Sequence, residues 1–213
     1  MGVLPNVAVP FVRCPRFSLI ILSRKLPVYD REALRTLILQ RALRFGEFTL
    51  ASGKASTYYL DGKQVTLDAE GAYLIGEGLL DLFEKTEMPD AVGGMSIGAD
   101  PITSAVITMS AVRRTPIRGF LVRKQPKGHG TNKFIEGPVQ PGEKVVIVED
   151  VVTTGGSSLE AIDRVKEFGL KVIRVAAVVD RMEGASEAFA DRGIPFSSLF
   201  TIRDFGIDPP KKG

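Results

Sequence analysis

Cysteine and histidine are almost absent from this chain of 213 residues, which contains one of each, Cys14 and His129. A single cysteine excludes an intramolecular disulfide framework and fits a reducing compartment, so we expect a cytoplasmic protein. No group of cysteines and histidines has the spacing of a metal site. Long apolar runs are missing as well, and none approaches the ~20 residues of a membrane-spanning helix. We therefore expect neither a disulfide scaffold nor a membrane protein.

Acidic residues are missing from residues 1–29, which contain the short apolar run Phe17–Leu22. The basic residues of this part are Arg13, Arg16, Arg24 and Lys25. A targeting segment is one interpretation, although the apolar run is short and no clear small-residue cleavage site follows it. We expect an N-terminal extension, either loosely ordered or draped over the body. A wrongly assigned start codon is a third alternative.

Two common phosphate-binding motifs are also absent. A P-loop needs a glycine-rich loop ending in Gly-Lys-Ser/Thr, and a dinucleotide site needs GxGxxG directly after a strand. With 44% hydrophobic and 25% charged residues, the composition is that of a globular protein, and the length allows one substantial core. The net charge of +3 is modest, and basic residues outside residues 123–133 are balanced by acids. This distribution favours a local anion site over a nucleic-acid surface.

The stretch KVVIVEDVVTTGGSS, residues 144–158, is the most informative part of the chain. Its run Val145–Val148 is continuous and β-branched, which predicts a strand buried on both faces of a parallel sheet. Glu149 and Asp150 end this predicted strand. A turn rich in hydroxyls and glycine follows, and then a helix whose apolar face extends over Leu159–Phe168.

Each part of this pattern suits a phosphorylated sugar. Backbone N–H groups at the start of a helix bind anions, and glycine lets the backbone approach a ligand closely. Carboxylates just before the turn would face the sugar, accept hydrogen bonds from ribose hydroxyls and offset positive charge on the ring. The hydroxyls that can donate to phosphate oxygens are those of Thr153, Thr154, Ser157 and Ser158. The pattern predicts a phosphate site beside an anomeric carbon, and an ordinary strand-to-helix turn is the alternative.

This stretch resembles the phosphoribosyl pyrophosphate signature of the type I phosphoribosyltransferase family: an apolar strand, two acidic residues and a small TTGGS-like loop. Enzymes with different base preferences share the signature, as do some regulators with the same fold. The resemblance implies Mg²⁺ as a cofactor, held mainly by phosphoribosyl pyrophosphate (PRPP) rather than by protein side chains. The residues that it places around PRPP are Arg123, Lys124, Lys127, His129, Glu149, Asp150, Val151, Val152, Thr153, Thr154, Gly155, Gly156, Ser157 and Ser158.

A second motif, FTLASGKASTYYLDGK, occupies residues 48–63. Its Ser-Gly pair between two strand-like runs predicts a hairpin within a hood of about residues 46–65. The motif resembles the branch of the family that uses orotate, in which the hood helps to bind the base. Ala51 and Lys54 depart from the lysine and arginine of well-known bacterial members. The resemblance implies an orotate site made of Lys54, Tyr58, Tyr59, Thr153 and Arg181, whereas the pattern alone favours packing roles for the tyrosines.

Two further strand ends belong to the predicted site. Arg181 follows the apolar run Val172–Val179, and its guanidinium suits a carboxylate, with a structural ion pair as the alternative. Glycines 93, 94 and 98 follow a shorter strand and indicate close approach to a ligand, which in the family is pyrophosphate. Some relatives have a lysine where this chain has Gly98, so we expect backbone amides to bind more of the pyrophosphate here.

Basic residues gather after the predicted strand Ile117–Val122, in the segment RKQPKGHGTNKFIEG. Glycine, proline and cations without apolar periodicity predict a long mobile loop at about residues 123–137, and such loops are often functional. A solvated charged loop is the alternative. The pattern RKxxKxHG resembles the catalytic loop of the orotate-using branch, whose lysine and histidine would stabilise or protonate the departing pyrophosphate. The expected catalytic residues are Lys127, His129, Glu149 and Asp150.

Strands near residues 91, 117, 144, 172 and 197 alternate with helices. We expect the first helix to be capped by Asp30 and to extend to about Arg44. This order predicts an α/β fold of the type I phosphoribosyltransferase class, with a parallel sheet flanked by helices and a small N-terminal hood. Ligands then bind at the carboxyl ends of the strands. We expect one domain, residues 30–213, after the extension of residues 1–29.

The resemblance implies a pentosyl transfer from PRPP to orotate that yields orotidine 5′-monophosphate and pyrophosphate in pyrimidine biosynthesis. It also implies a homodimer in which the basic loop of one subunit acts at the site of the other. One rival is a phosphoribosyltransferase for adenine or a salvage pyrimidine, although neutral bases would not need Arg181 or the hood motif. The other rival is a non-catalytic regulator that binds nucleic acid, which would need an extended basic face. We expect neither nucleic acid nor a membrane as a partner.

Overall fold

A β-sheet forms the centre of the computed structural model, which describes residues 29–49, 55–126 and 134–209. Within these residues the sheet has six strands in the order β5-β4-β3-β6-β7-β8. Their bounds are β3 (Ala91–Met95), β4 (Arg118–Val122), β5 (Ile135–Glu136), β6 (Lys144–Val152), β7 (Lys171–Asp180) and β8 (Phe196–Thr201). All neighbours pair in parallel except β5, which pairs antiparallel with β4 at one edge. The predicted parallel sheet is confirmed, and β5 adds a short antiparallel edge inside the segment expected to be a loop.

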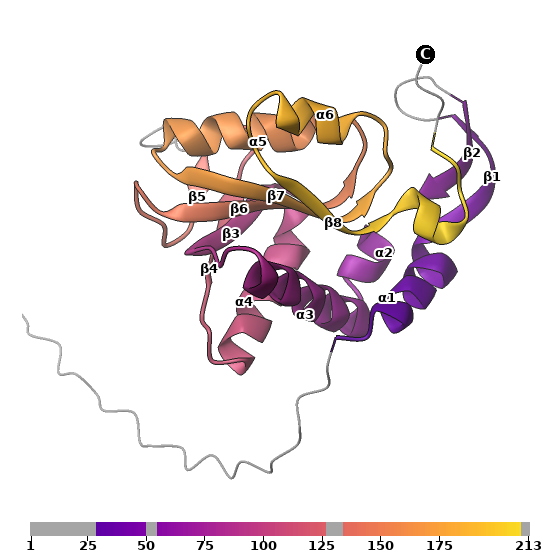
Figure 1. Ribbon diagram of the computed structural model, residues 1–213, viewed down its shortest axis with the longest axis horizontal. Helices are drawn as coiled ribbons and strands as arrows, with labels where there is room; N and C mark the ends of the chain where they lie inside the picture. Colours follow the sequence, from indigo (N-terminus) through magenta and orange to yellow (C-terminus); the bar gives the residue numbers. More distant parts are fainter. Residues whose placement is uncertain (1–28, 50–54, 127–133, 210–213) are drawn as a thin grey trace, which may run out of the picture.

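Helices cover both faces of the sheet, as Figure 1 shows: α5 and α6 lie over one face, and α3 and α4 over the other. The helices are α1 (Arg31–Leu37), the π-helical η1 (Ile38–Ala42), α2 (Lys63–Thr66), α3 (Ala69–Lys85), α4 (Ala99–Val112), α5 (Gly156–Glu167), α6 (Ala185–Ala190) and the 3₁₀ turn η2 (Ile202–Phe205). Asp30 and Asp68 cap α1 and α3 with side-chain hydrogen bonds to backbone N–H groups, and the cap predicted at Asp30 is confirmed.

The run Val145–Val148 in β6 explains the position of this strand at the centre of the sheet. Val145 and Ile147 pack into the core under α5, and Val146 and Val148 pack into the core under α3 and α4. All four side chains are fully buried. Successive side chains of a strand point to opposite faces, so an uninterrupted apolar run serves both helical layers.

Three boundaries differ from the predicted ones, and strand pairing explains two of them. β6 does not end at Glu149 but continues to Val152, since β7 keeps pairing with it through Asp180. The helix that follows begins at Gly156, before its apolar face starts. The first helix ends at Ala42 instead of Arg44, because the next residue already pairs in the hood.

The hood is an antiparallel hairpin of β1 (Leu43–Thr49) and β2 (Ala55–Leu60). Figure 1 shows the hairpin beside the sheet, next to α1. The predicted hairpin is confirmed, and its first strand starts earlier than the sequence pattern indicated. Its tip, residues 50–54, lies outside the described residues.

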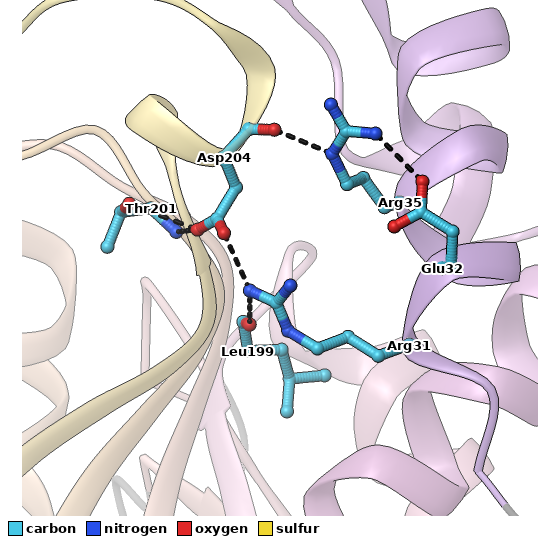
Figure 2. A network of polar contacts seen from close by, with 6 residues as sticks. All are labelled: Arg31, Glu32, Arg35, Leu199, Thr201 and Asp204. Carbon is cyan, nitrogen blue, oxygen red and sulfur yellow. Dashed lines mark hydrogen bonds and ion pairs between the residues drawn. The ribbon is translucent and has the colours of Figure 1, made fainter.

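A network of arginines ties α1, the helix that leads into the hood, to the C-terminal part of the domain (Figure 2). Arg31 Nη2 lies 2.7 Å from Asp204 Oδ1, and Arg35 Nε donates to the backbone oxygen of Asp204 at 2.6 Å. Asp204 Oδ2 also accepts from the backbone N–H and the hydroxyl of Thr201. The hood is therefore anchored at its base to the end of β8.

No helix within the described residues combines the length and apolar character needed to cross a membrane.

Candidate active site

An acidic pair lies near the carboxyl end of the central strand β6. Glu149 and Asp150 each expose 8% of their surface. Burial, together with the neighbouring charge of Asp150, raises the pKa of Glu149 to about 8. This shift favours the protonated form of Glu149 near neutral pH, and Ser158 Oγ donates a hydrogen bond to its Oε2 at 3.4 Å.

Two glycines from other elements cover this pair. A Cβ atom on Gly98, at the start of α4, would lie 2.7 Å from Glu149 Oε1 and 3.0 Å from Asp150 Oδ1. A Cβ atom on Gly62, just after the hood, would lie 2.8 Å from Asp150 Oδ2. The turn after β3 and the end of the hood thus approach the carboxylates with backbone alone, because side chains at these positions would displace them.

The turn from β6 into α5 forms a polar pocket of about 30 Å³ lined by Glu149, Val151, Val152, Thr153 and residues 155–158. Gly155 caps α5 with a φ of +83°, a left-handed conformation that favours glycine. Its missing side chain also matters, because a Cβ atom there would lie 2.8 Å from the ring of Phe189. The first backbone N–H groups of α5 have no acceptors within the helix, so the pocket is suited to an anion.

Arg181 joins the end of β7 to the hood. Its backbone N–H donates to the oxygen of Val152 at 2.9 Å, which holds it beside the end of β6. Its Nε lies 3.0 Å from the hydroxyl of Tyr58 and 2.8 Å from Glu183 Oε1, and its guanidinium lies 4.7 Å from the centre of the Tyr58 ring. Within the described residues, no hydrogen bond joins its two terminal nitrogens to a partner. Arg181 exposes only 8% of its surface, so it is a buried cation with donors to spare.

The two ends of the basic loop leave the sheet at the same edge, after β4 and before β5. The Arg123 backbone N–H donates to the oxygen of Phe134 at 2.8 Å, and Arg123 Nη1 lies 3.5 Å from Glu136 Oε1. Arg123 and Lys124 are exposed. The ends of β4, β6 and β7 therefore supply an acidic pair, a turn suited to an anion, a buried arginine and two exposed cations.

Comparison with known proteins identifies the family of this chain. The profile of the phosphoribosyl transferase domain matches residues 77–197. The orotate phosphoribosyltransferase of Rhodopirellula baltica is 52% identical over 84% of this chain and 96% of its own length. The chain belongs to the orotate phosphoribosyltransferase family. The Aquifex aeolicus orotate phosphoribosyltransferase is also similar, at 49% identity over 82% of this chain and 97% of its own length.

Solved structures of orotate phosphoribosyltransferases have the same fold. The Mycobacterium tuberculosis enzyme in complex with Fe(III) dicitrate has a TM-score of 0.74 at 36% identity, over 84% of this chain and 99% of the other. The same enzyme in complex with PRPP has a TM-score of 0.71 at 34% identity over the same shares. The type I phosphoribosyltransferase fold expected from the sequence is thus confirmed.

In this orotate phosphoribosyltransferase fold, most of the predicted site residues that the structure describes lie together. The acidic pair and residues 151–158 form the end of β6 and the following turn, and Tyr58 meets Arg181 across the hood. Val152 is only 2% exposed, so it can contribute only backbone groups. Tyr59 lies apart, because it points to the other side of the hairpin, is 45% exposed and packs on Phe48 with ring centres 5.7 Å apart. Three predicted residues lie outside the described residues, namely Lys54, Lys127 and His129.

Two charged residues of this site were not predicted. Lys63 Nζ lies 3.1 Å from Asp61 Oδ1 and 4.0 Å from Asp150 Oδ2, so it brings a cation to the acidic pair. Glu183 brings an anion to Arg181. Lys63 ends the hood motif and Glu183 lies two residues after Arg181, so proximity to these motifs was the available signal. Their partners could not be recognised without the tertiary contacts.

The fit of Mg²⁺ can be judged from the oxygen donors of the orotate phosphoribosyltransferase site. Glu149 and Asp150 offer carboxylate oxygens, which Mg²⁺ prefers. Among the described residues, no group of three or more histidines, cysteines or acidic residues is arranged to hold a metal. Mg²⁺ commonly binds through one or two carboxylates together with substrate phosphates. The donor set therefore fits an ion held mainly by a diphosphate substrate.

Proposed function

We propose that this protein transfers the ribosyl 5-phosphate group of PRPP to N1 of orotate, and so produces orotidine 5′-monophosphate and pyrophosphate in pyrimidine biosynthesis. The observation that carries the choice of base is the buried Arg181, whose two terminal nitrogens form no hydrogen bond within the described residues. Glu183 pairs with its Nε, and the carboxylate of orotate matches the remaining planar donors of the guanidinium. Adenine and uracil carry no such group.

The turn after β6 binds the 5-phosphate in this proposal. The first backbone N–H groups of α5 and the hydroxyls of Thr153, Thr154 and Ser157 donate to the phosphate oxygens. Ser158 is turned toward Glu149 instead, so its hydroxyl supports the acidic pair. Departure of pyrophosphate leaves positive charge on the ribose, and the neighbouring carboxylates offset that charge.

Charge on the departing pyrophosphate is neutralised from two sides. Arg123, Lys124, Lys127 and His129 supply cations or a proton from the basic loop. Mg²⁺, when bound with PRPP, supplies further positive charge, and Glu149 and Asp150 are the side chains that could contact it.

We further propose a homodimer in which the basic loop of one subunit serves the site of the other. An apolar groove of about 610 Å³ between α3 and α4 supports the dimer, since large apolar surfaces mark interaction sites. Leu67 is one of its lining residues and exposes 71% of its surface. A two-fold dimer that buried this groove would contain two equivalent sites.

The test of the activity is a direct assay. The purified full chain is mixed with orotate, PRPP and Mg²⁺, and the loss of orotate ultraviolet absorbance is followed. Adenine and uracil are tested in parallel by release of pyrophosphate. Of the three bases, we expect only orotate to be turned over. Turnover of adenine or uracil, together with no turnover of orotate, would reject the proposal.

A further inference from the structure

Arg164 lies two turns into α5, and its guanidinium reaches both described ends of the basic loop. Nη1 donates to the backbone oxygen of Arg123, and Nη2 donates to the backbone oxygen of Lys124 at 3.2 Å. The same guanidinium lies 4.4 Å from the centre of the Phe134 ring, where the chain returns toward β5. One side chain thus contacts residues on either side of the loop.

Other contacts hold Arg164 in this position. Nη2 forms an ion pair with Glu160, one turn earlier on α5, and Nη1 lies 3.7 Å from Met95 Sδ at the end of β3. The side chain of Arg164 is only 14% exposed, whereas that of Glu160 is 56% exposed. A guanidinium this enclosed, with both terminal nitrogens bonded to backbone oxygens, has a well-defined geometry.

The placement of Arg164 couples two parts of the proposed active site. α5 begins at Gly156 with the turn that binds the phosphate in the proposed function, and Arg164 belongs to the same rigid helix. The backbone oxygens that it binds belong to Arg123 and Lys124, the exposed cations proposed to face pyrophosphate. The backbone of Arg123 and Lys124 is thereby held relative to the phosphate turn by one side chain.

We propose that Arg164 is a positioning residue that sets the distance between the cations of the basic loop and the phosphate-binding turn. The proposal rests on the proposed function for its kinetic consequence but not for its structural one. The role requires an arginine, because the two terminal nitrogens of the guanidinium bind two backbone oxygens at once while its charge lies over the Phe134 ring. A lysine keeps the charge and loses the fork.

The kinetic test compares Arg164→Met and Arg164→Lys with the wild type, using the full chain well below its melting temperature. Misplaced charged groups cost up to ~10²-fold in rate, so we expect both variants to lose about tenfold in kcat/KM for PRPP. The KM for orotate should stay within about twofold, because neither Arg181 nor Tyr58 is among the contacts of Arg164 within the described residues. Phe134→Leu, which removes the ring and keeps an apolar residue, should lower kcat/KM for PRPP by a smaller factor.

The matched control is Arg192→Met. Arg192 also forms an ion pair with α5, through Asp163 at 2.8 Å, but its side chain is 46% exposed and it follows α6 rather than β4. We expect its kinetic constants to remain those of the wild type. Full activity in Arg164→Lys, or equal losses in the Arg164 and Arg192 variants, would overturn the proposal.

A measurement without substrate separates this proposal from the proposed activity. Amide hydrogen exchange at residues 118–126 and 134–137 should become faster in Arg164→Met and stay unchanged in Arg192→Met. Unchanged exchange at both segments would refute the positioning role even if the enzyme turned over orotate. Faster exchange in a protein that did not use orotate would keep the positioning role and reject the proposed function alone.

Discussion

At the scale of single residues, the acidic pair combines two carboxyl groups in one buried place, and the two cannot be equally charged at low cost. Glu149 takes up a proton because burial and the neighbouring charge both disfavour its ionised form. At pH 7 the pair therefore carries less negative charge than two free carboxylates would. Positive charge that develops on a ribose, or a bound metal ion, would favour loss of this proton.

The pKa of Glu149 predicts how stability depends on pH. The pKa rises from 4.5 to about 8 on folding, so between these values the folded protein binds a proton that the unfolded chain releases. The contribution of Glu149 to the free energy of unfolding is therefore fully present below about pH 4.5 and is lost as pH rises to about 8. Each unit of the shift corresponds to ~1.4 kcal/mol, so the total is on the order of a few kcal/mol.

Glu149→Gln removes this titration and should gain stability over the wild type as pH rises from about 5 to about 8, with a constant difference above about 9. Thermal unfolding of both proteins without ligands, at intervals of about one pH unit, measures the difference. A melting-temperature difference that did not change with pH would show that Glu149 ionises normally in the folded protein.

Arg181→Ala should raise the KM for orotate by about 10²-fold and change the KM for PRPP much less. The reason is that the base alone carries a carboxylate for this guanidinium, and hydrogen bonds to charged groups contribute ~1.5–3 kcal/mol. Steady-state kinetics with each substrate varied in turn provides the measurement. Arg174→Ala is the control, because Arg174 lies on the same strand but binds Ser197 Oγ at 2.7 Å, away from the carboxyl end. Equal increases in both KM values would remove Arg181 from the base site.

At the scale of elements, the turn between β6 and α5 depends on the backbone of Gly155. Gly155→Ala should lower stability by ~1–2 kcal/mol for the left-handed conformation, with a further cost from the Phe189 ring. It should also raise the KM for PRPP severalfold, because relief of the clash moves the first turn of α5. Denaturant unfolding and steady-state kinetics give the two readings.

Gly193→Ala is the control that separates the effect of backbone strain from the effect of a displaced turn before α5. Gly193 has a φ of +66°, and a Cβ atom there would meet nothing within 4 Å. We expect a loss of stability from the backbone alone, with the KM for PRPP unchanged. If both variants changed that KM alike, the effect would be one of general stability and the turn would have no special role.

At the scale of the whole molecule, the proposed dimer predicts complementation between two inactive variants. Lys127→Ala damages only the basic loop, and Asp150→Asn damages only the sugar site. In a mixed dimer, one site receives the intact loop of the Asp150→Asn chain and the intact sugar site of the Lys127→Ala chain. With random exchange of equal amounts, activity should recover to roughly a quarter of wild type. If the chains exchange and activity stays at the level of the separate variants, the loop acts within its own subunit.

The sequence by itself determined the elements that have a strong local pattern. The β-branched run Val145–Val148 predicts the central strand because a strand buried on both faces needs apolar residues at every position. Asp30 predicts the start of the first helix because its side chain can bind a free N–H group three residues away. The acidic pair and the turn after it were also recognisable, since consecutive residues form both.

Only the tertiary structure decided the features that depend on partners far along the chain. β6 continues past Glu149 because β7 supplies hydrogen-bond partners for it. Tyr58 meets Arg181 although 123 positions separate them, and Tyr59 turns away because the hairpin alternates its side chains. Arg164 reaches two residues about 40 positions earlier, which no periodicity on its own helix could indicate. Local propensity acts over a few residues, whereas these contacts exist only after the sheet has brought its strand ends to one edge.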